Sequence, residues 1–119
     1  MSSILISTES RYSVDREKIK AAITSVLKSR KITSAVEISV LICGTRKSKE
    51  LAKKYLNDDK PHNVLSFPME DMHLLGDIAV CYPLAQEEAN RDNVLVDTKI
   101  NELVSHATLH LLGEHHVLS

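Results

Sequence analysis

Three histidines near the carboxyl end of the chain have a spacing that constrains the local fold more than any other feature. They are His106, His110 and His116, in the order HxxxHxxGxxH with Gly113 between the second and the third. Residues four apart on a helix share a face, so the first two imidazoles can point at one ion. Glycine tolerates the left-handed conformation that ends a helix, and that reversal would return His116 as a third ligand. Three imidazoles leave one position of a Zn²⁺ ion open, as in catalytic zinc sites.

The third ligand and the kind of metal site have alternatives. His115 can replace His116, because a helix that ends at Gly113 can present either residue. A histidine-rich segment can also bind metal only adventitiously. The same spacing occurs in metzincin peptidases, but these have a general-base glutamate where this chain has Ala107. The missing carboxylate argues against a metzincin and leaves a degraded peptidase open.

The composition is that of an ordinary soluble domain. Of the 119 residues, 43% are hydrophobic and 26% are charged, and the net charge is −1. No apolar run approaches the roughly 20 residues that span a bilayer, and no secretory signal is recognisable. We therefore expect one cytoplasmic domain over residues 1–119, with neither a membrane nor DNA as a partner. Cys43 and Cys81 are predicted to be reduced thiols in buried strands.

Hydrophobic periodicity predicts four strands and four helices. The strands are expected at residues 4–6, 36–42, 63–67 and 76–81. The helices are expected to begin at residues 14–15, to cover 46–56 and 83–92, and to run from a cap at Asp97 through the first two histidines. Thr45 is the predicted cap of the second helix, which should turn Leu51 and Tyr55 inward. This order predicts an α+β fold, a small mixed sheet with helices packed mainly on one side, and the metal site on the C-terminal helix and the following turn.

Three segments together resemble the YbeY family of bacterial metal-dependent endoribonucleases. The family pattern HGxLHLxGYDH is similar to HATLHLLGEHH at residues 106–116. The family segment YRGKDKPTNVLSFP is similar to YLNDDKPHNVLSFP at residues 55–68, and the family's LGDI strand matches residues 75–78. The three segments occur in the order that the family has, which makes the combined match far more specific than any one of them.

The resemblance implies a fold, a metal and an activity. The implied fold is a four-stranded mixed sheet with helices, and the implied metal is Zn²⁺ held by His106, His110 and His116. The implied activity is single-strand-specific RNA cleavage in ribosomal RNA maturation and ribosome quality control, with the small ribosomal subunit as a partner. Imidazoles also bind nickel, copper and iron, so the native metal is left open.

Other side chains are candidates for roles around the metal. Asp77 and Glu114 are candidates to orient a ligand imidazole or to act as a general base, although Asp77 could instead only satisfy a turn. Ser66 could contact the substrate or only the backbone. Phe67 is expected in the core rather than stacked on a base, so readout of the RNA sequence is not expected. The candidates to hold RNA phosphates, each also interpretable as an ordinary surface lysine, are Lys53, Lys54 and Lys60.

The chain departs from the family pattern at positions close to the expected chemistry. Leu56 occupies the place of an arginine that is thought to serve activity and substrate binding, and an apolar side chain cannot contact phosphate. His115 replaces an aspartate of the motif, and Glu114 replaces a tyrosine. The alternative hypothesis is therefore a weakly active or non-catalytic metal-binding factor of ribosome biogenesis.

Overall fold

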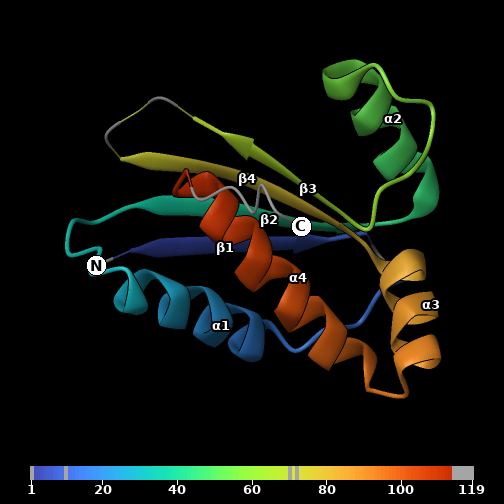
Figure 1. Cartoon of the computed structure of the whole chain (residues 1–119), viewed down its shortest axis with the longest axis horizontal. Helices are drawn as coiled ribbons and strands as arrows, with labels where there is room; N and C mark the ends of the chain where they lie inside the picture. The colour runs from blue at the N-terminus through green and yellow to red at the C-terminus, as the bar shows by residue number, and fades with distance from the viewer. Residues whose placement is uncertain (1, 10, 70, 72, 114–119) are drawn as a thin grey trace.

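A mixed four-stranded sheet lies at the centre of the computed structural model, which describes residues 2–9, 11–69, 71 and 73–113. Strands and helices alternate for most of this length (Figure 1). In chain order they are β1 (Ser3–Thr8), α1 (Arg16–Ser29), β2 (Glu37–Cys43), α2 (Thr45–Leu56), β3 (Val64–Pro68), β4 (Leu74–Cys81), α3 (Tyr82–Asp92) and α4 (Val96–Leu111). The predicted α+β fold with its mixed sheet is confirmed.

The strand order in the sheet is β1-β2-β4-β3. β1, β2 and β4 are parallel, and each of the two parallel connections includes a helix, as parallel pairing requires. β3 is antiparallel to β4 and forms an edge of the sheet. The register pairs Ser66 with Ile78, Phe67 with Asp77 and Pro68 with Gly76. Directly paired residues project from the same face, so this register decides which side chains meet which helix.

The two faces of the sheet carry different numbers of helices. Ile38, Val40 and Ile42 of β2 are buried in the main core with residues of α1 and α4. On the opposite face, Ala52 of α2 packs with Leu65 of β3 and Ala79 of β4. Figure 1 shows α1 and α4 on one side of the sheet and α2 on the other. The helices therefore pack mainly on one side, as the sequence predicts.

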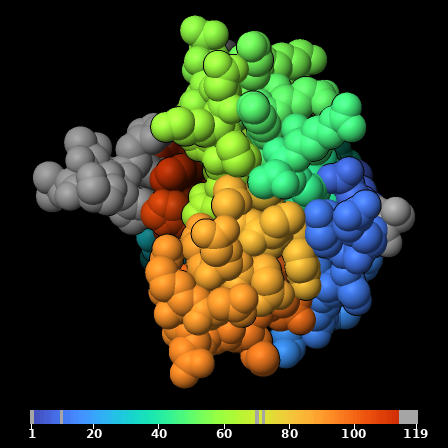
Figure 2. All heavy atoms as spheres, turned by 90° about the vertical axis from the view of Figure 1, so that its right-hand side faces the viewer, coloured from blue at the N-terminus to red at the C-terminus, as the bar shows by residue number. Residues whose placement is uncertain are grey.

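The carboxyl end of the parallel strands is covered by α3. Figure 2 shows α3 in orange below α2 in green, with the N-terminal segment in blue beside them. Tyr82, the first residue of α3, stacks on Tyr12 from the segment between β1 and α1, with ring centroids 4.7 Å apart. Aromatic stacking of this kind joins α3 to the N-terminal part of the chain.

Three details of the helices differ from the sequence-based predictions. The residue at the cap position of α2 is Gly44, and Thr45, the predicted cap, is the first residue of the helix. Leu95 occupies the cap position of α4, so Asp97, the predicted cap, lies within the first turn. The Asp97 carboxylate instead accepts a bond from the backbone N–H of Asp15, 3.4 Å away, so it joins α4 to the start of α1. Tyr55, predicted to turn inward, is 55% exposed because it lies in the last turn of α2, beyond the part that Ala52 packs on the sheet.

Both cysteines are free and buried, as predicted. Cys43 of β2 and Cys81 of β4 are paired in the parallel register. Burial, the largest cause, raises the pKa of the Cys43 thiol to about 12 and also raises that of Cys81. Since the thiolate is the nucleophile and the metal ligand, neither side chain is suited to those roles near neutral pH. No helix in the described ranges has the length and apolar character needed to cross a membrane.

Candidate functional site

The histidine pair lies on the last two turns of α4. Ile100, Val104, Ala107 and Leu111 form the buried stripe that packs this helix on the sheet. His110 lies half-buried beside the stripe, and the exposed His106 lies one turn before it. Their ring centroids are 4.6 Å apart, and the ring planes are inclined at 58°. The two imidazoles are therefore neighbours on one face, which is the arrangement that a shared metal ion needs.

The turn after α4 has the conformation expected from the glycine. Gly113 has φ +86, in the left-handed region, and its backbone N–H donates to the carbonyl oxygen of His110 at 2.9 Å. Glu114, His115 and His116 lie outside the described residues. Within the described ranges, no three His, Cys, Asp or Glu side chains are grouped so that they could hold a metal ion. The three-histidine site therefore stays a prediction. The adjacent imidazoles of His106 and His110 are suitable donors for such a site.

Gly76 fixes how closely the end of α4 approaches the sheet. A Cβ atom added there would lie 2.7 Å from Cδ2 of Leu111 and 3.1 Å from Cα of Pro68. Gly76 therefore faces α4, and the turn that carries Leu111 lies against both β3 and β4. His110, the residue before Leu111, therefore lies where α4 packs closely on the sheet.

Ser66 and Asp77, both candidates for roles near the metal, lie on opposite faces of the sheet. Ser66 pairs with Ile78 of the main core, so it projects toward the face that carries α4. Asp77 follows Gly76 and pairs with Phe67, so it projects toward the face covered by α2. Because the sheet separates Asp77 from α4, this side chain does not fit a role in orienting the imidazole of His106 or His110.

Asp77 instead lines a pocket of about 620 Å³ on the α2 face. The aromatic rings of Tyr55 and Phe67 lie in its wall, with centroids 4.9 Å apart and planes inclined at 52°. Leu56 and Met69, both exposed, lie beside them. Leu56, the position where the sequence predicts the loss of a family arginine, is thus part of this pocket and makes it more apolar.

The three predicted RNA-binding lysines gather around the end of α2. Lys53 is paired with Asp59 at 3.2 Å, and Nζ of Lys54 lies 5.2 Å from the centroid of the Tyr55 ring. Lys60 lies in the loop that follows, where its backbone N–H donates to the Asp58 carboxylate. All three lysines are exposed, so they are available to a charged polymer on this side of the molecule.

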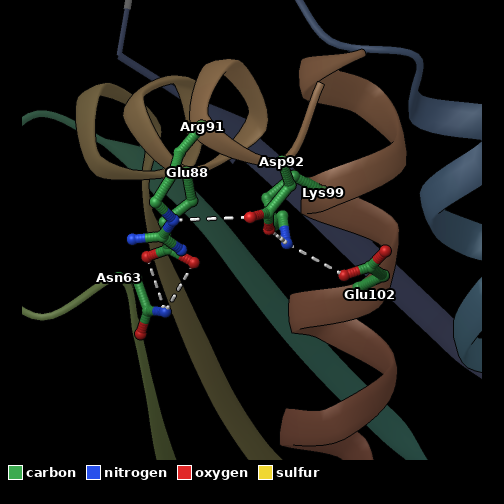
Figure 3. A network of polar contacts seen from close by, with 6 residues as sticks. All are labelled: Asn63, Glu88, Arg91, Asp92, Lys99 and Glu102. Carbon is green, nitrogen blue, oxygen red and sulfur yellow. Dashed lines mark hydrogen bonds and ion pairs between the residues drawn. The ribbon is translucent and has the colours of Figure 1, made fainter. Parts of the chain in front are cut away.

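A polar network that the sequence analysis missed positions α4. The buried Lys99 donates to Asp92 at 2.7 Å and to Glu102 at 3.1 Å (Figure 3). Glu88 of α3 accepts from the side-chain amide of Asn63, 2.9 Å away, just before β3. α3 is therefore bonded both to the histidine helix and to the start of the Ser66 strand. The sequence contains a signal that could have predicted this network. Lys99 lies next to Ile100 on the apolar side of a helix, and Glu102, three residues later, is in position to pair with it.

The Asp92–Lys99 pair makes stability depend on pH. The hydrogen bond from Lys99, the largest cause, lowers the pKa of Asp92 below its ordinary 3.8. That stabilisation is present above pH 3.8 and is lost as the pH falls through the lower folded-state pKa. The same pair raises the pKa of Lys99 above 10.5, so its part is present below pH 10.5 and is lost as the pH rises through the folded-state value.

Replacing Asp92 by asparagine is expected to remove the acid-side part of this dependence. The Asp92→Asn protein should have a lower Tm than the wild type at pH 7, and the difference should shrink as the pH falls below 3.8 and through the lowered folded-state pKa of Asp92. Differential scanning calorimetry from pH 2 to pH 8 measures this. Asp59→Asn, which alters a pair exposed on both sides, is the control and should show almost no difference. An Asp92→Asn difference independent of pH would contradict the assignment.

The fold and the histidine pair first define the class of protein: a small α+β domain with two neighbouring histidines, a residue type that binds metals, on its last helix. Comparison with protein-family models matches residues 5–118 to the model described as Endoribonuclease YbeY. The Endoribonuclease YbeY of Cellvibrio japonicus is 34% identical over 119 residues, which cover 96% of this chain and 67% of that protein. The chain therefore belongs to the YbeY family.

Two other relatives and a solved structure agree with this assignment. Endoribonuclease YbeY of Thermobifida fusca is 29% identical, covering 96% of this chain and 81% of that protein. That of Colwellia psychrerythraea is 36% identical over 86 residues, 68% of this chain, and the match spans 56% of the relative's own length. The solution structure of TM1509 from Thermotoga maritima has a TM-score of 0.67 and 29% identity, over 100% of this chain and 77% of that one.

Proposed function

We propose that this protein is a zinc-dependent, single-strand-specific endoribonuclease that acts in the cytoplasm in ribosomal RNA maturation and ribosome quality control, with the small ribosomal subunit as a partner. The observation that carries the proposal is the pair of adjacent imidazoles, His106 and His110, on the last helix of a YbeY-family chain. Relatives named as endoribonucleases supply the reaction class. His116 completes the proposed ligand set, and His115 is the alternative.

In the proposed mechanism the residues of the chain mainly bind and orient. A zinc ion held by the three histidines would supply a Lewis acid and would lower the pKa of a water molecule towards 7. His106 and His110 would hold the metal at the end of α4, beside the strand from which Ser66 projects toward the same face. Ser66 is proposed to contact the substrate there, and Glu114 to act as the general base. The nucleophile is water or the 2′-hydroxyl of the RNA.

Lys53, Lys54 and Lys60 are proposed to hold the RNA backbone. They are exposed and close to one another at the end of α2, as backbone contacts require. Contacts to phosphate carry no information on base sequence, so they position the strand without selecting it. Binding through them should weaken steeply as salt concentration rises.

The proposal is tested by coupling metal content to cleavage. Protein treated with a chelator should lose cleavage of a single-stranded RNA, and added Zn²⁺ should restore it. A duplex of the same sequence should resist cleavage in both states. Cleavage that is insensitive to the chelator, or equal on the duplex, would contradict the proposal. Chelator-sensitive cleavage of casein would instead support the degraded peptidase.

A second candidate function, a weakly active or non-catalytic metal-binding factor, is favoured by one specific observation. Leu56 ends α2 and is 52% exposed, so an apolar side chain stands in the open where the family places a guanidinium. A single charged donor at a developing negative charge contributes about 10² to 10³ in rate. Its loss is the physical reason for expecting slow cleavage.

Replacing Leu56 by arginine is therefore expected to raise the rate of RNA cleavage. A flexible surface side chain should recover only part of the donor effect, on the order of tenfold. The measurement is kcat/KM on a single-stranded RNA. Leu95→Arg adds the same charge at a 75% exposed leucine before α4 and should leave the rate near that of the wild type. Equal rates for Leu56→Arg and the wild type would show that Leu56 does not limit activity.

A further inference from the structure

The pocket on the α2 face is separate from the histidine pair of α4. It lies on the other face of the sheet, and Asp77, Tyr55, Leu56 and Phe67 line it. Its volume is about 620 Å³, which is more than one planar heterocycle needs. Pockets of this size with a mostly apolar wall and few polar groups are typical ligand sites.

The wall of this pocket is suited to a flat apolar ligand. Tyr55 is 55% exposed, and its ring meets that of Phe67 at 4.9 Å between centroids. Leu56 and Met69 are also large exposed apolar side chains of this pocket, at 52% and 45%. Aromatic rings exposed next to such side chains offer a stacking platform, and every nucleobase has a face that can stack on one.

Asp77 is the only charged residue among the described residues that line the pocket, beside the hydroxyls of Ser7 and Ser39, and its carboxylate accepts hydrogen bonds only. The carboxylate of Asp77 is half-buried, and no residue in the described ranges gives it a hydrogen bond or an ion pair. A partly buried carboxylate is costly unless a donor meets it, so a ligand with N–H groups is favoured. Cytosine, adenine and guanine carry an exocyclic amino group, whereas the N3–H of uracil lies between two carbonyl acceptors that would repel a carboxylate.

Basic side chains lie on α2, the helix that borders the pocket. Along α2 the sequence TRKSKELAKKYL holds five basic residues and one acidic residue. Nζ of Lys54 lies 5.2 Å from the ring centroid of Tyr55, and Lys53 and Lys60 lie nearby along the chain. An acceptor in the pocket with cations around it complements a ligand that joins an amino-bearing ring to phosphate.

We propose that this pocket is a nucleobase subsite that takes an amino-bearing base, cytosine, adenine or guanine, from single-stranded RNA and disfavours uracil. Tyr55 stacks on the base, Asp77 accepts from its amino group, and Lys53 and Lys54 contact the flanking phosphates. The proposal rests on the proposed function, because RNA is the ligand in both.

The edge strand connects this subsite to the histidine helix. Phe67 of β3 projects to the pocket side, whereas the side chain of Ser66, a residue that also borders the pocket, projects to the α4 side. Within the part of the chain that the structure describes, β3 has no neighbour on its outer side in the strand order β1-β2-β4-β3. A bound strand can therefore pass over this edge, with one base held in the pocket while a phosphate several nucleotides away reaches α4.

The test measures base preference in binding, separately from cleavage. Fluorescence anisotropy with labelled hexamers of cytidine and uridine is recorded on the wild-type protein, and a gel confirms that the hexamers stay intact. We expect the cytidine hexamer to bind on the order of tenfold more tightly, as one good base contact provides. Asp77→Asn keeps the shape but adds a donor, and should reduce this ratio to about twofold or less. Glu17→Gln, which removes a charge from α1, should keep the wild-type ratio.

The stacking residue is tested with a matched pair of variants. Tyr55→Leu should weaken binding of both hexamers on the order of tenfold, whereas Tyr55→Phe should bind like the wild type. Tyr55 is exposed, so an unchanged Tm should accompany both variants. Equal binding of the two hexamers by the wild type, or a ratio unaffected by Asp77→Asn, would overturn the proposal. The same variants are also tested with a peptide rich in lysine and arginine. If Tyr55→Leu and Asp77→Asn weakened binding of this peptide but not of the hexamers, the proposal would be overturned and the pocket would be assigned to a protein partner.

Failure of this inference and failure of the proposed function give different results. If cleavage depended on zinc while the cytidine and uridine hexamers bound equally, the proposed nuclease function would stand and the nucleobase subsite would be rejected. Base-selective binding without any cleavage would retain the subsite and support the non-catalytic alternative.

Discussion

Replacing His110 by alanine is expected to remove nearly all RNA cleavage and most of the bound zinc. Loss of a residue that merely supports a zinc ligand costs about 10- to 100-fold, so loss of a ligand should reduce kcat/KM by more than about 100-fold. Cleavage of a single-stranded RNA and metal content, measured on the same preparations of wild-type and variant protein, test this together.

The fold should survive this substitution. His110 lies beside the buried stripe of α4 rather than within it, and the stripe itself is unchanged. A Tm close to that of the metal-free wild type would show that the loss of activity has a local cause. Added Zn²⁺ should raise the Tm of the wild type and have little effect on the variant, because only a folded site gains stability from the metal.

A second histidine variant separates metal ligation from a general loss of imidazole. His73→Ala removes an exposed imidazole before β4, outside the proposed ligand set, and should keep both zinc and activity. Equal cleavage products from the wild type and His110→Ala would identify a contaminating nuclease and remove the enzymatic proposal. Full zinc content in His110→Ala would show that the cation is held elsewhere.

The parts of the fold that follow from local periodicity could be predicted from the sequence. α4 has its apolar residues at helical spacing, and Val104, Ala107 and Leu111 are buried as that period requires. The same spacing predicted neighbouring imidazoles, which is a local property of one helix. The burial of Cys43 also followed from its place in an apolar strand.

The features that could not be predicted depend on contacts between distant segments. Whether Asp77 faces α4 or α2 is decided by the register of β4 with β3 and by which helix covers which face. A shift of one residue would exchange the two faces, and no local pattern distinguishes them. Tyr55 was predicted inward because its spacing from Leu51 fits a buried stripe, but the pocket leaves the end of α2 open. Asp97 resembles a helix cap, yet its partner is Asp15, 82 positions away in the sequence.

The second large effect is expected from replacing Gly76 by alanine. Gly76 has φ +151, a conformation that residues with a side chain rarely adopt, and an added Cβ would meet the carbonyl oxygen of Phe67 and Cδ2 of Leu111. Backbone strain and overpacking each cost about 1 to 3 kcal/mol, so the free energy of unfolding should fall by about 3 kcal/mol or more. Urea denaturation followed by circular dichroism measures this change.

Gly113 is the matched control, because it shares the positive φ but not the close contacts. Its φ is +86, and an added Cβ would have no heavy atom within 4 Å, so Gly113→Ala should cost only about 1 kcal/mol, from the conformation alone. Equal losses for the two variants would mean that conformation explains both and that the contact with Leu111 contributes nothing. A larger loss at Gly76, accompanied by lower zinc affinity, would show that close packing of β4 against Leu111 holds the neighbouring His110 in place. The placement of the metal ligand would then depend on the sheet as well as on the helix that carries it.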